Sequence, residues 1–229
     1  MSGAEHLGPY LLEVKEGVFP LGGDSLALGA FATVKRGWRV CDLGTGSGCL
    51  LLMLAAREGG LSLTGVEREE RAAQCARENL VHSGLEGTVL QADWRQVTLP
   101  AGGFDLVISN PPYFQPGHGG DGGEARQADC SLEELCRTAA RLLRNRGRFA
   151  LCHRPERLAD LMCALRGSGL EPKRMRLLAH GPDGGGAPGA ARSADRTVRG
   201  AGAPNWSAEK FQKNFGPHAI NETSHALCS

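Results

Sequence analysis

The chain has 229 residues, which suits one domain with a sizeable core, and a net charge of +1, which neither favours nor excludes nucleic acid as a partner. Its longest apolar run, Cys49–Ala56, is far too short to span a bilayer, and no charged-then-apolar signal segment opens it, so we expect a cytoplasmic protein without a membrane partner. The eight cysteines are scattered without a Cys-x-x-Cys pair, which favours small buried thiols over disulfides or a metal site.

The first motif along the chain is a strand, a glycine-rich loop and a helix. Trp38–Asp42 is typical of a short buried strand, Leu43–Gly48 of a loop and Cys49–Arg57 of a helix, and together they begin a nucleotide-binding βαβ unit. The spacing Asp-x-Gly-x-Gly-x-Gly is not the dinucleotide fingerprint, and no Gly-Lys-Ser/Thr follows, which argues against a pyrophosphate site. The glycines let a ligand approach the backbone closely, and Asp42 could accept a hydrogen bond from a ligand ammonium group.

The next two predicted strands each end in an acid. Leu61–Glu67 leads into a helix over Glu69–Ser83, and Thr88–Asp93 follows. An acid at the end of the second strand of such a sheet holds ribose hydroxyls, which is the role that we expect for Glu67. Asp93 is well placed for an adenine amine, and an acid that only ends a strand in a turn is the alternative.

The most informative stretch is Asn110-Pro111-Pro112-Tyr113, directly after the apolar strand Phe104–Ser109. Two prolines cannot continue a sheet ladder or open an ordinary helical turn. They fix a bend that holds the Asn110 amide and the Tyr113 ring at a strand's carboxyl end, where ligands bind in open α/β sheets. An Asn carbonyl, a prolyl carbonyl and an aromatic face can grip a planar exocyclic amine. The alternative is a proline-rich turn that only ends the strand.

Alternating elements continue after this bend. Ser131, followed by Glu134, has the pattern of a capping box that opens a helix ending at Leu143. Such alternation predicts an α/β protein with a mostly parallel twisted sheet and helices on both faces. The remaining predicted elements are a strand over Arg148–His153, a helix over Pro155–Leu165 and a strand over Arg174–His180.

Positive charge is concentrated in one segment. Between Arg137 and Arg176, eleven Arg and Lys side chains stand against three acids, a net charge of +8, whereas the rest of the chain carries −7. A tRNA or another structured RNA would bind such a segment through its phosphates. A solvated, arginine-rich helical surface is the alternative.

The alternating pattern ends near residue 182. From Pro182 to Pro204 the chain is rich in glycine, alanine, proline and arginine with almost no periodicity, and Asn205–Ser229 has only a faint one. We therefore expect one domain over residues 1–182 and an atypical, disordered tail over residues 183–229.

Taken in order, the motifs resemble those of a known family. The loop Asp42–Gly48, the acids Glu67 and Asp93, and the Asn110–Tyr113 turn are similar to those of S-adenosylmethionine-dependent methyltransferases that act on an amine nitrogen. The resemblance covers about residues 5–182. Two flanking segments, Leu21–Phe31 and Tyr113–Phe114, narrow it to the bacterial adenine N6-methyltransferases that modify a valine tRNA beside its anticodon. Three later segments fit as well: Ala139–Leu143, Gly147–Leu151 and Gly169–Arg176.

The resemblance implies a Rossmann-like class I methyltransferase fold, whose last strand is antiparallel and lies between the fifth and the sixth. Arg196–Arg199 is a poor candidate for that strand. The sequence therefore raises the hypothesis that the strand is missing and that this particular chain is inactive or unstable.

The resemblance also assigns roles to the motif residues. The catalytic set would be Asn110, Pro111 and Tyr113. The Asn110 side-chain carbonyl and the Pro111 backbone carbonyl would accept both hydrogens of the adenine amine, and Tyr113 would stack on the base. The cofactor S-adenosylmethionine would be held by Asp42, Gly44 and Gly46 at its methionine portion, Glu67 at its ribose, Asp93 at its adenine and Asp24 beside the methionine.

Two other functions stay open. Protein glutamine N5-methyltransferases that act on release factors share the glycine loop and the Asn-Pro-Pro-Tyr turn, but they carry a helical recognition domain ahead of the fold, for which we expect residues 1–41 to be too few. The other is an inactive RNA-binding relic of the fold, which loss of S-adenosylmethionine binding would support.

Overall fold

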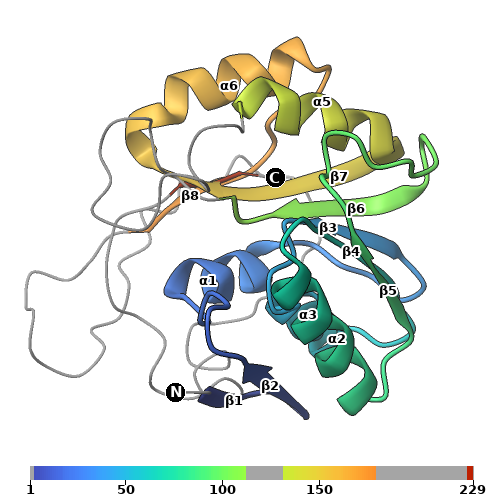
Figure 1. The fold of residues 1–229 in the computed structure, drawn as a ribbon. Coiled ribbons are helices and arrows are strands. Elements are labelled where there is room, and N and C mark those ends of the chain that lie inside the picture. The colour runs from blue at the N-terminus through green and yellow to red at the C-terminus, as the bar shows by residue number, and fades with distance from the viewer. Residues whose placement is uncertain (1–2, 112–130, 179–225, 229) are drawn as a thin grey trace, which may run out of the picture.

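The computed structural model describes residues 3–111, 131–178 and 226–228 (Figure 1). Its sheet consists of β3 (Arg39–Leu43), β4 (Ser62–Glu67), β5 (Gly87–Gln91), β6 (Phe104–Ser109), β7 (Leu143–His153), β8 (Met175–Leu177) and β9 (Ala226–Cys228). The seven strands lie in the order β5-β4-β3-β6-β7-β9-β8. Neighbours from β5 to β7 are parallel, and β9 is antiparallel to both β7 and β8, which confirms the mostly parallel sheet.

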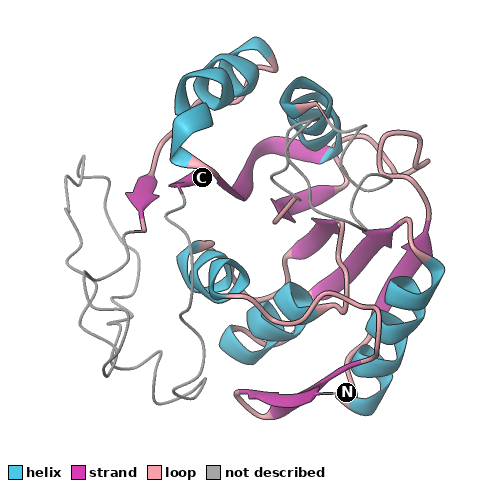
Figure 2. Cartoon of the chain, turned by 60° about the vertical axis from the view of Figure 1, so that its left-hand side comes forward, coloured by secondary structure: helices cyan, strands magenta, loops and turns pink. Residues whose placement is uncertain are grey.

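Helices cover both faces of the sheet (Figures 1 and 2), because successive strand residues point to opposite sides and both sides are apolar. In β3, Val40 belongs to one core and Cys41 to the other, and Leu106 and Val107 of β6 divide in the same way. None of the described helices has the length and apolarity needed to cross a bilayer. One face carries α1 (Gly23–Phe31), α2 (Cys49–Arg57) and α3 (Glu70–His82), and the other carries α5 (Leu132–Leu142) and α6 (Leu158–Gly167).

Most of the predicted elements are confirmed. The limits of α2 and β6 are those predicted, and α5 begins with the predicted capping box, in which the Ser131 hydroxyl accepts from the Glu134 N–H. β7 begins earlier than expected, at Leu143, and a 3-10 turn (Pro155–Arg157) precedes α6. β5 ends at Gln91, so the acid expected at its end lies two residues beyond the strand.

The hypothesis that the last strand is missing is wrong. β9 lies between β7 and β8, where the resemblance places that strand, and Cys228 pairs with Leu151 on one side and with Met175 on the other. The sheet therefore includes residues beyond the predicted domain limit at 182. β9 has only three residues, which are too few to show an alternation of apolar and polar side chains. The strand is therefore specified by its pairing with β7 and β8 and not by a local sequence pattern. Residues 179–225, with the candidate Arg196–Arg199, lie outside the described part.

An antiparallel hairpin that was not predicted packs on the side of α2 and α3 (Figure 2). β1 (Gly3–Leu7) and β2 (Tyr10–Val14) are joined by a two-residue turn in which Gly8 has a φ of +65°. Leu7 and Leu12 are fully buried in the core that α2 and α3 share. The Gly8-Pro9 pair between two short runs was the available signal for this hairpin.

Candidate functional site

The order of the sheet reverses between β3 and β6. β3 leads to α2 on one face, and the next described helix after β6 is α5 on the other. In open α/β sheets, ligands bind in the crevice at the carboxyl ends of two such strands. Asp42, Glu67 and Asn110 all stand at this edge, because β3, β4 and β6 are parallel and Asp42 pairs with Gly65 and Ile108. The structure thus brings together three of the predicted site residues.

The loop after β3 is anchored to the end of β4 by hydrogen bonds. Gly44 N–H and Thr45 N–H donate to the Val66 carbonyl (2.8 and 3.1 Å), and Gly46 N–H donates to the Glu67 carboxylate (2.9 Å). Gly44 and Gly46 have φ values of +78° and +55°, where side chains are strained, and a Cβ on either would meet no other atom within 4 Å. The loop therefore offers an open backbone at this edge of the sheet.

Asp42 is fully buried, and one of its carboxylate oxygens is unsatisfied. Oδ2 accepts a hydrogen bond from the Thr45 hydroxyl (2.7 Å), whereas Oδ1 has no partner among the described residues. Burial raises the pKa of Asp42 to about 7, the Thr45 hydrogen bond opposes that rise and the Glu67 carboxylate adds to it. A cationic or N–H group that reached Oδ1 would remove the cost of this orphaned acceptor.

Glu67 ends β4 with both carboxylate oxygens engaged by backbone N–H groups. Oε2 accepts from Gly46 and Oε1 from Glu69, each at 2.9 Å. An ionised carboxylate has about four acceptor sites, so each oxygen can also accept a ligand hydroxyl. The side chain is thus fixed in place by the same bonds that hold the glycine loop.

Asp93 has a cationic partner within its own turn. The Arg95 backbone N–H and Nε donate to its Oδ1 (2.9 and 3.0 Å), and Arg95 Nη2 lies 2.5 Å from Oδ2. These hydrogen bonds with Arg95 hold the pKa of Asp93 below its ordinary value, against the effect of partial burial. The contacts match the alternative of an acid in a strand-end turn, and the adenine role of Asp93 stays a prediction.

Asn110 is held by α1, a helix that the sequence analysis did not identify. Its amide nitrogen donates to the Ser25 hydroxyl in the first turn of that helix (3.0 Å). The preceding Ser109 hydroxyl donates to the Leu43 carbonyl (2.7 Å), which fixes the end of β6 against the end of β3. Together these bonds set both the position and the orientation of the amide, because its nitrogen must face Ser25.

The Cys49 thiol lies beside both this amide support and the glycine loop. Cys49, the first residue of α2, is half-buried, and its thiol lies close to the side chains of Ser25 and Ser47. Burial, with the Asp42 charge, raises the pKa of the thiol to about 12, and the two serine hydroxyls oppose that rise, so the thiol stays protonated. The start of α1, the start of α2 and the loop therefore form one polar cluster.

Sequence reasoning missed Ser25 and chose its neighbour. Asp24 lies half-buried in the same first turn, so the N-terminus of α1 does border the site. The sequence signal for the start of this helix was the Gly-Gly-Asp-Ser segment ahead of an apolar run. Pro111 is buried directly after Asn110, whereas Pro112 and Tyr113 lie outside the described residues, so the stacking role of Tyr113 stays a prediction.

Comparison with known proteins identifies the family. A model of the methyltransferase small domain matches residues 22–161, which include α1, the glycine loop and Asn110. The chain belongs to the methyltransferase small-domain family. Among solved structures, one described as a predicted O-methyltransferase, protein Atu636 from Agrobacterium tumefaciens, has a TM-score of 0.56 over 87% of this chain and 100% of its own, at 22% identity. This chain therefore has the Rossmann-like class I methyltransferase fold.

Two curated relatives of this chain are named tRNA1(Val) (adenine(37)-N6)-methyltransferase. The one from Citrobacter koseri is 45% identical over 101 residues, which cover 42% of this chain and 41% of the relative. The one from a Flavobacteriaceae bacterium is 31% identical over 145 residues, 62% of each chain. The match therefore spans less than two thirds of the length of either relative.

Proposed function

We propose that this protein transfers a methyl group from S-adenosylmethionine to the N6 amine of an adenine in RNA, with tRNA as the substrate. The observation that carries the proposal is the Asn110 amide, fixed by Ser25 where β6 ends beside the open glycine loop after β3. The names of the two tRNA1(Val) relatives support the substrate class. A tRNA substrate also supports the expectation of a cytoplasmic protein.

The loop residues fit S-adenosylmethionine by their donors and acceptors. Asp42 Oδ1, buried without a described partner, would accept from the methionine ammonium group, and the backbone at Gly44 and Gly46 is open to close approach. Glu67 would accept from the ribose hydroxyls. When bound, S-adenosylmethionine supplies a sulfonium-bound methyl group that an amine nitrogen can attack.

Two further acids complete the proposed cofactor site. Asp93 can accept the adenine amine while it keeps Arg95, because a carboxylate has more acceptor sites than Arg95 occupies. Asp24 would close the methionine side from the first turn of α1. Both roles come from the family resemblance, and the described neighbours of Asp93 and Asp24 leave room for them.

At the target base, the protein's contribution is positioning and charge stabilisation. The lone pair of an adenine amine is delocalised into the ring and is weakly nucleophilic. The Asn110 side-chain carbonyl and the Pro111 backbone carbonyl would each accept one amine hydrogen, which favours a pyramidal nitrogen whose lone pair faces the methyl group. The same carbonyls would stabilise the positive charge that develops on nitrogen as the sulfur–methyl bond breaks, so the transfer step itself needs no general base, and the methylated amine would then lose one proton to solvent. Tyr113 would stack on the extruded base.

The alternatives use the same edge of the sheet. A glutamine side-chain amide is also a planar amine, so a protein glutamine N5-methyltransferase would bind its substrate at Asn110 as well. An inactive relic would have lost the cofactor site, and the ordered loop around Gly44, the Glu67 bonds and β9 all count against it. Substrate assays separate these functions.

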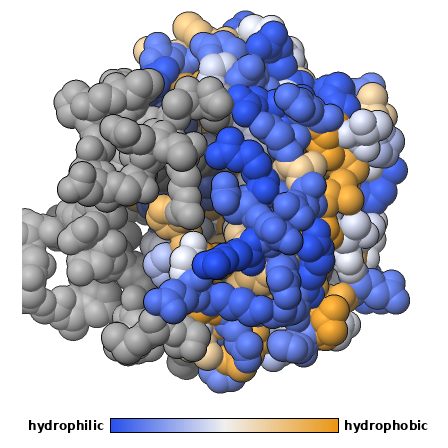
Figure 3. Space-filling view, in the orientation of Figure 1, coloured by the Kyte–Doolittle hydropathy of each residue, from blue (hydrophilic) through white to orange (hydrophobic). Residues whose placement is uncertain are grey.

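Eight of the eleven cations in the predicted RNA-binding segment, Arg137–Arg176, form two groups. One group is engaged within the protein: Arg141 with the Val97 and Leu99 carbonyls, Arg144 with Asp105, Arg157 with Asp160 and Arg166 with Glu171. The other group is exposed and in no ion pair among the described residues: Arg146, Arg148, Lys173 and Arg176. Of these, Arg148 donates to the Thr33 hydroxyl and Arg176 lies over the Phe31 ring. Hydrophilic residues also cover most of the described surface in the view of Figure 3. We place the phosphate contacts of the RNA on the second group.

Calorimetric titration of the full chain with S-adenosylmethionine tests the cofactor site, and methyl transfer to unmodified tRNA tests the substrate. We expect micromolar cofactor binding, transfer to tRNA and no transfer to a release-factor glutamine peptide. Asn110→Ala should abolish transfer and keep cofactor binding. Transfer to the peptide alone would favour the glutamine alternative, and absence of cofactor binding would favour the relic. Retained turnover by Asn110→Ala would rule out the proposed mechanism.

A further inference from the structure

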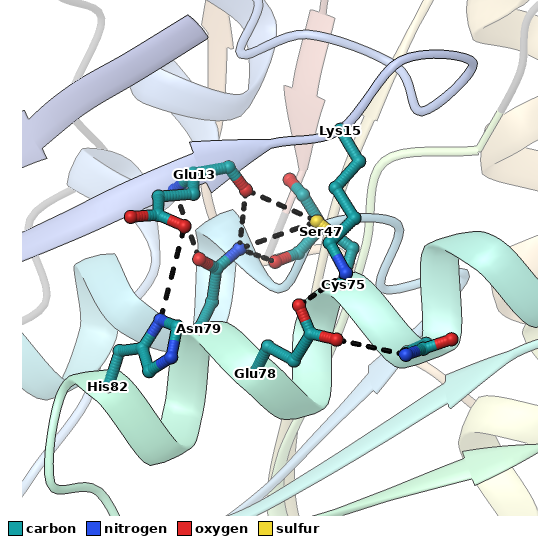
Figure 4. A network of polar contacts seen from close by, with 8 residues as sticks. Glu13, Lys15, Ser47, Cys75, Glu78, Asn79 and His82 are labelled. Carbon is teal, nitrogen blue, oxygen red and sulfur yellow. Dashed lines mark hydrogen bonds and ion pairs between the residues drawn. The ribbon is translucent and has the colours of Figure 1, made fainter. Parts of the chain in front are cut away.

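A buried amide on α3 connects the N-terminal hairpin with the glycine loop. Asn79 is 1% exposed and lies between Glu13 of β2 and Ser47 of the loop (Figure 4). Its Oδ1 accepts the Glu13 N–H (3.0 Å), and its Nδ2 donates to the Glu13 carbonyl and to the Ser47 carbonyl (2.9 Å each). The carboxamide therefore uses its oxygen and both of its N–H groups.

With Glu13, the Asn79 amide pairs as a neighbouring strand would, because it bonds both backbone groups of one residue. The Cys75 thiol, one turn earlier on α3, donates to the same Glu13 carbonyl (3.2 Å). β2 is thus attached to α3 by polar bonds as well as by packing of Leu12. The bond to Ser47 needs a separate explanation, since this residue belongs to no strand or helix.

The peptide between Ser47 and Gly48 is held at both ends. Its carbonyl accepts from Asn79, and its N–H donates to the Thr45 carbonyl (2.8 Å). Thr45 in turn donates its hydroxyl to Asp42 (2.7 Å). A continuous series of hydrogen bonds therefore runs from α3, through the last turn of the loop, to the carboxylate that we assign to the cofactor.

We propose that Asn79 is a positioning residue for the cofactor loop and that the β1–β2 hairpin is the outer support of this residue. The inference rests on the proposed function, because it assumes that S-adenosylmethionine binds at the loop. Without the Asn79 amide, the carbonyls of Glu13 and of the buried Ser47 would each lose a donor, and the loop would gain other conformations. The cofactor would then have to order the loop on binding, which lowers its affinity.

Two substitutions at Asn79 test whether its hydrogen bonds, and not only the volume of its side chain, hold the loop in place. Asn79→Asp keeps the shape and the acceptor for Glu13 N–H but has no N–H group for Ser47, and Asn79→Ala removes the whole amide. We expect the Kd for S-adenosylmethionine, measured by calorimetry where melting curves show folded protein, to rise at least about tenfold in both. With saturating cofactor, kcat should stay within about twofold, because Asn79 touches no reacting group.

Glu78→Gln is the matched control. Glu78 is the neighbouring residue of α3 and pairs with Lys15 just beyond β2, but it does not reach the loop (Figure 4). It should leave the Kd within about twofold of wild type. Asn79 variants that melt at lower temperature yet bind the cofactor like wild type would overturn the inference, because they would show a purely structural role.

Hydrogen exchange tests whether Asn79 holds the loop in place without relying on cofactor binding. If wild type bound no S-adenosylmethionine, the proposed function would fail, yet Asn79 could still be tested on the free chain. We expect the Gly46 and Gly48 amides to exchange at least about tenfold faster in both Asn79 variants than in wild type, while the Glu78→Gln amides exchange at the wild-type rate. Unchanged exchange in the Asn79 variants would also overturn the inference.

Discussion

Asp42 couples protonation to folding at the proposed cofactor site. Its pKa of about 7 in the folded chain lies above the ordinary value of 3.8, so the folded chain holds this proton more tightly than the unfolded chain does. The resulting stabilisation is complete below about pH 4 and is lost as the pH rises through about 7. At 1.36 kcal/mol per pKa unit it amounts to about 4 kcal/mol.

We expect the unfolding free energy of wild type to fall by up to about 4 kcal/mol, relative to Asp42→Asn, between about pH 4 and pH 8. Urea titrations at a series of pH values measure this difference. Asp160→Asn, which changes an exposed carboxylate on α6, should keep the wild-type slope. Wild-type and Asp42→Asn curves that run parallel would contradict the raised pKa.

Ser25→Ala tests whether orientation of the Asn110 amide matters for transfer. The change removes the acceptor for the Asn110 N–H, and one neutral hydrogen bond is worth about 1 kcal/mol, so we expect kcat to fall about fivefold. The Kd for S-adenosylmethionine should change by less than about twofold. Methyl transfer to tRNA measures kcat, with Ser62→Ala at the exposed start of β4 as the control. An unchanged kcat would mean that other groups orient Asn110.

Among the elements, α1 depends on an arginine that α2 contributes. Arg57 donates to the carbonyls of Gly29 and Ala32, which lie in the last turn and at the C-cap of α1. Cationic donors satisfy the free carbonyls at a helix C-terminus and interact favourably with its dipole. Because α1 carries Ser25 at its other end, Arg57 supports the site from a distance.

Arg57→Met preserves most of the side chain's bulk and removes the donors to α1. We expect a loss of about 2 kcal/mol in unfolding free energy, which corresponds to a melting midpoint lower by about 4–8 °C in a chain of this size. Differential scanning calorimetry measures it, and Arg36→Met in the exposed loop after α1 is the control. Equal midpoints for the two variants would show that the two bonds contribute little.

Sequence patterns predicted the elements whose signals are local. The apolar spacing of α2, the apolar run of β6 and the Ser131 cap lie within their own segments, and they placed Asp42, Glu67 and Asn110 at one edge. Contacts between distant segments could not be predicted in this way. The Asn110–Ser25 bond joins residues 85 positions apart, and β9 depends on pairing with two strands far away in the sequence.

Removal of residues 226–229 tests the contribution of β9. Among the described residues, β8 pairs only with β9, so its loss separates β8 from the sheet and exposes the edge of β7. The lost hydrogen bonds predict a decrease of about 2–4 kcal/mol in unfolding free energy, measured by urea titration. Deletion of Ser229 alone is the control. A shortened chain as stable as the control would show that β9 is not needed for the fold.

The proposed cofactor residues and the proposed RNA contacts belong to different parts of the sequence. Residues 3–111 contain every described residue that we assign to S-adenosylmethionine or to the amine, whereas the exposed cations Arg146, Arg148, Lys173 and Arg176 lie in residues 131–178. The charge is divided in the same way, with +8 between Arg137 and Arg176 in a chain whose net charge is +1. RNA binding and cofactor binding should therefore respond to different mutations.

The double variant Arg146→Gln, Lys173→Gln tests this separation. Each cation that contacts a phosphate adds about 0.7 to 0.9 to the slope of log K against log salt, so the slope for unmodified tRNA should become shallower by about 1.4 to 1.8. Fluorescence anisotropy at several salt concentrations measures it, and the Kd for S-adenosylmethionine should not change. Arg166→Gln, whose guanidinium pairs with Glu171 (3.2 Å), should change the slope little. A slope of log K against log salt equal to that of wild type would mean that Arg146 and Lys173 are solvated surface residues that do not contact the RNA. The RNA contacts would then lie elsewhere on the chain.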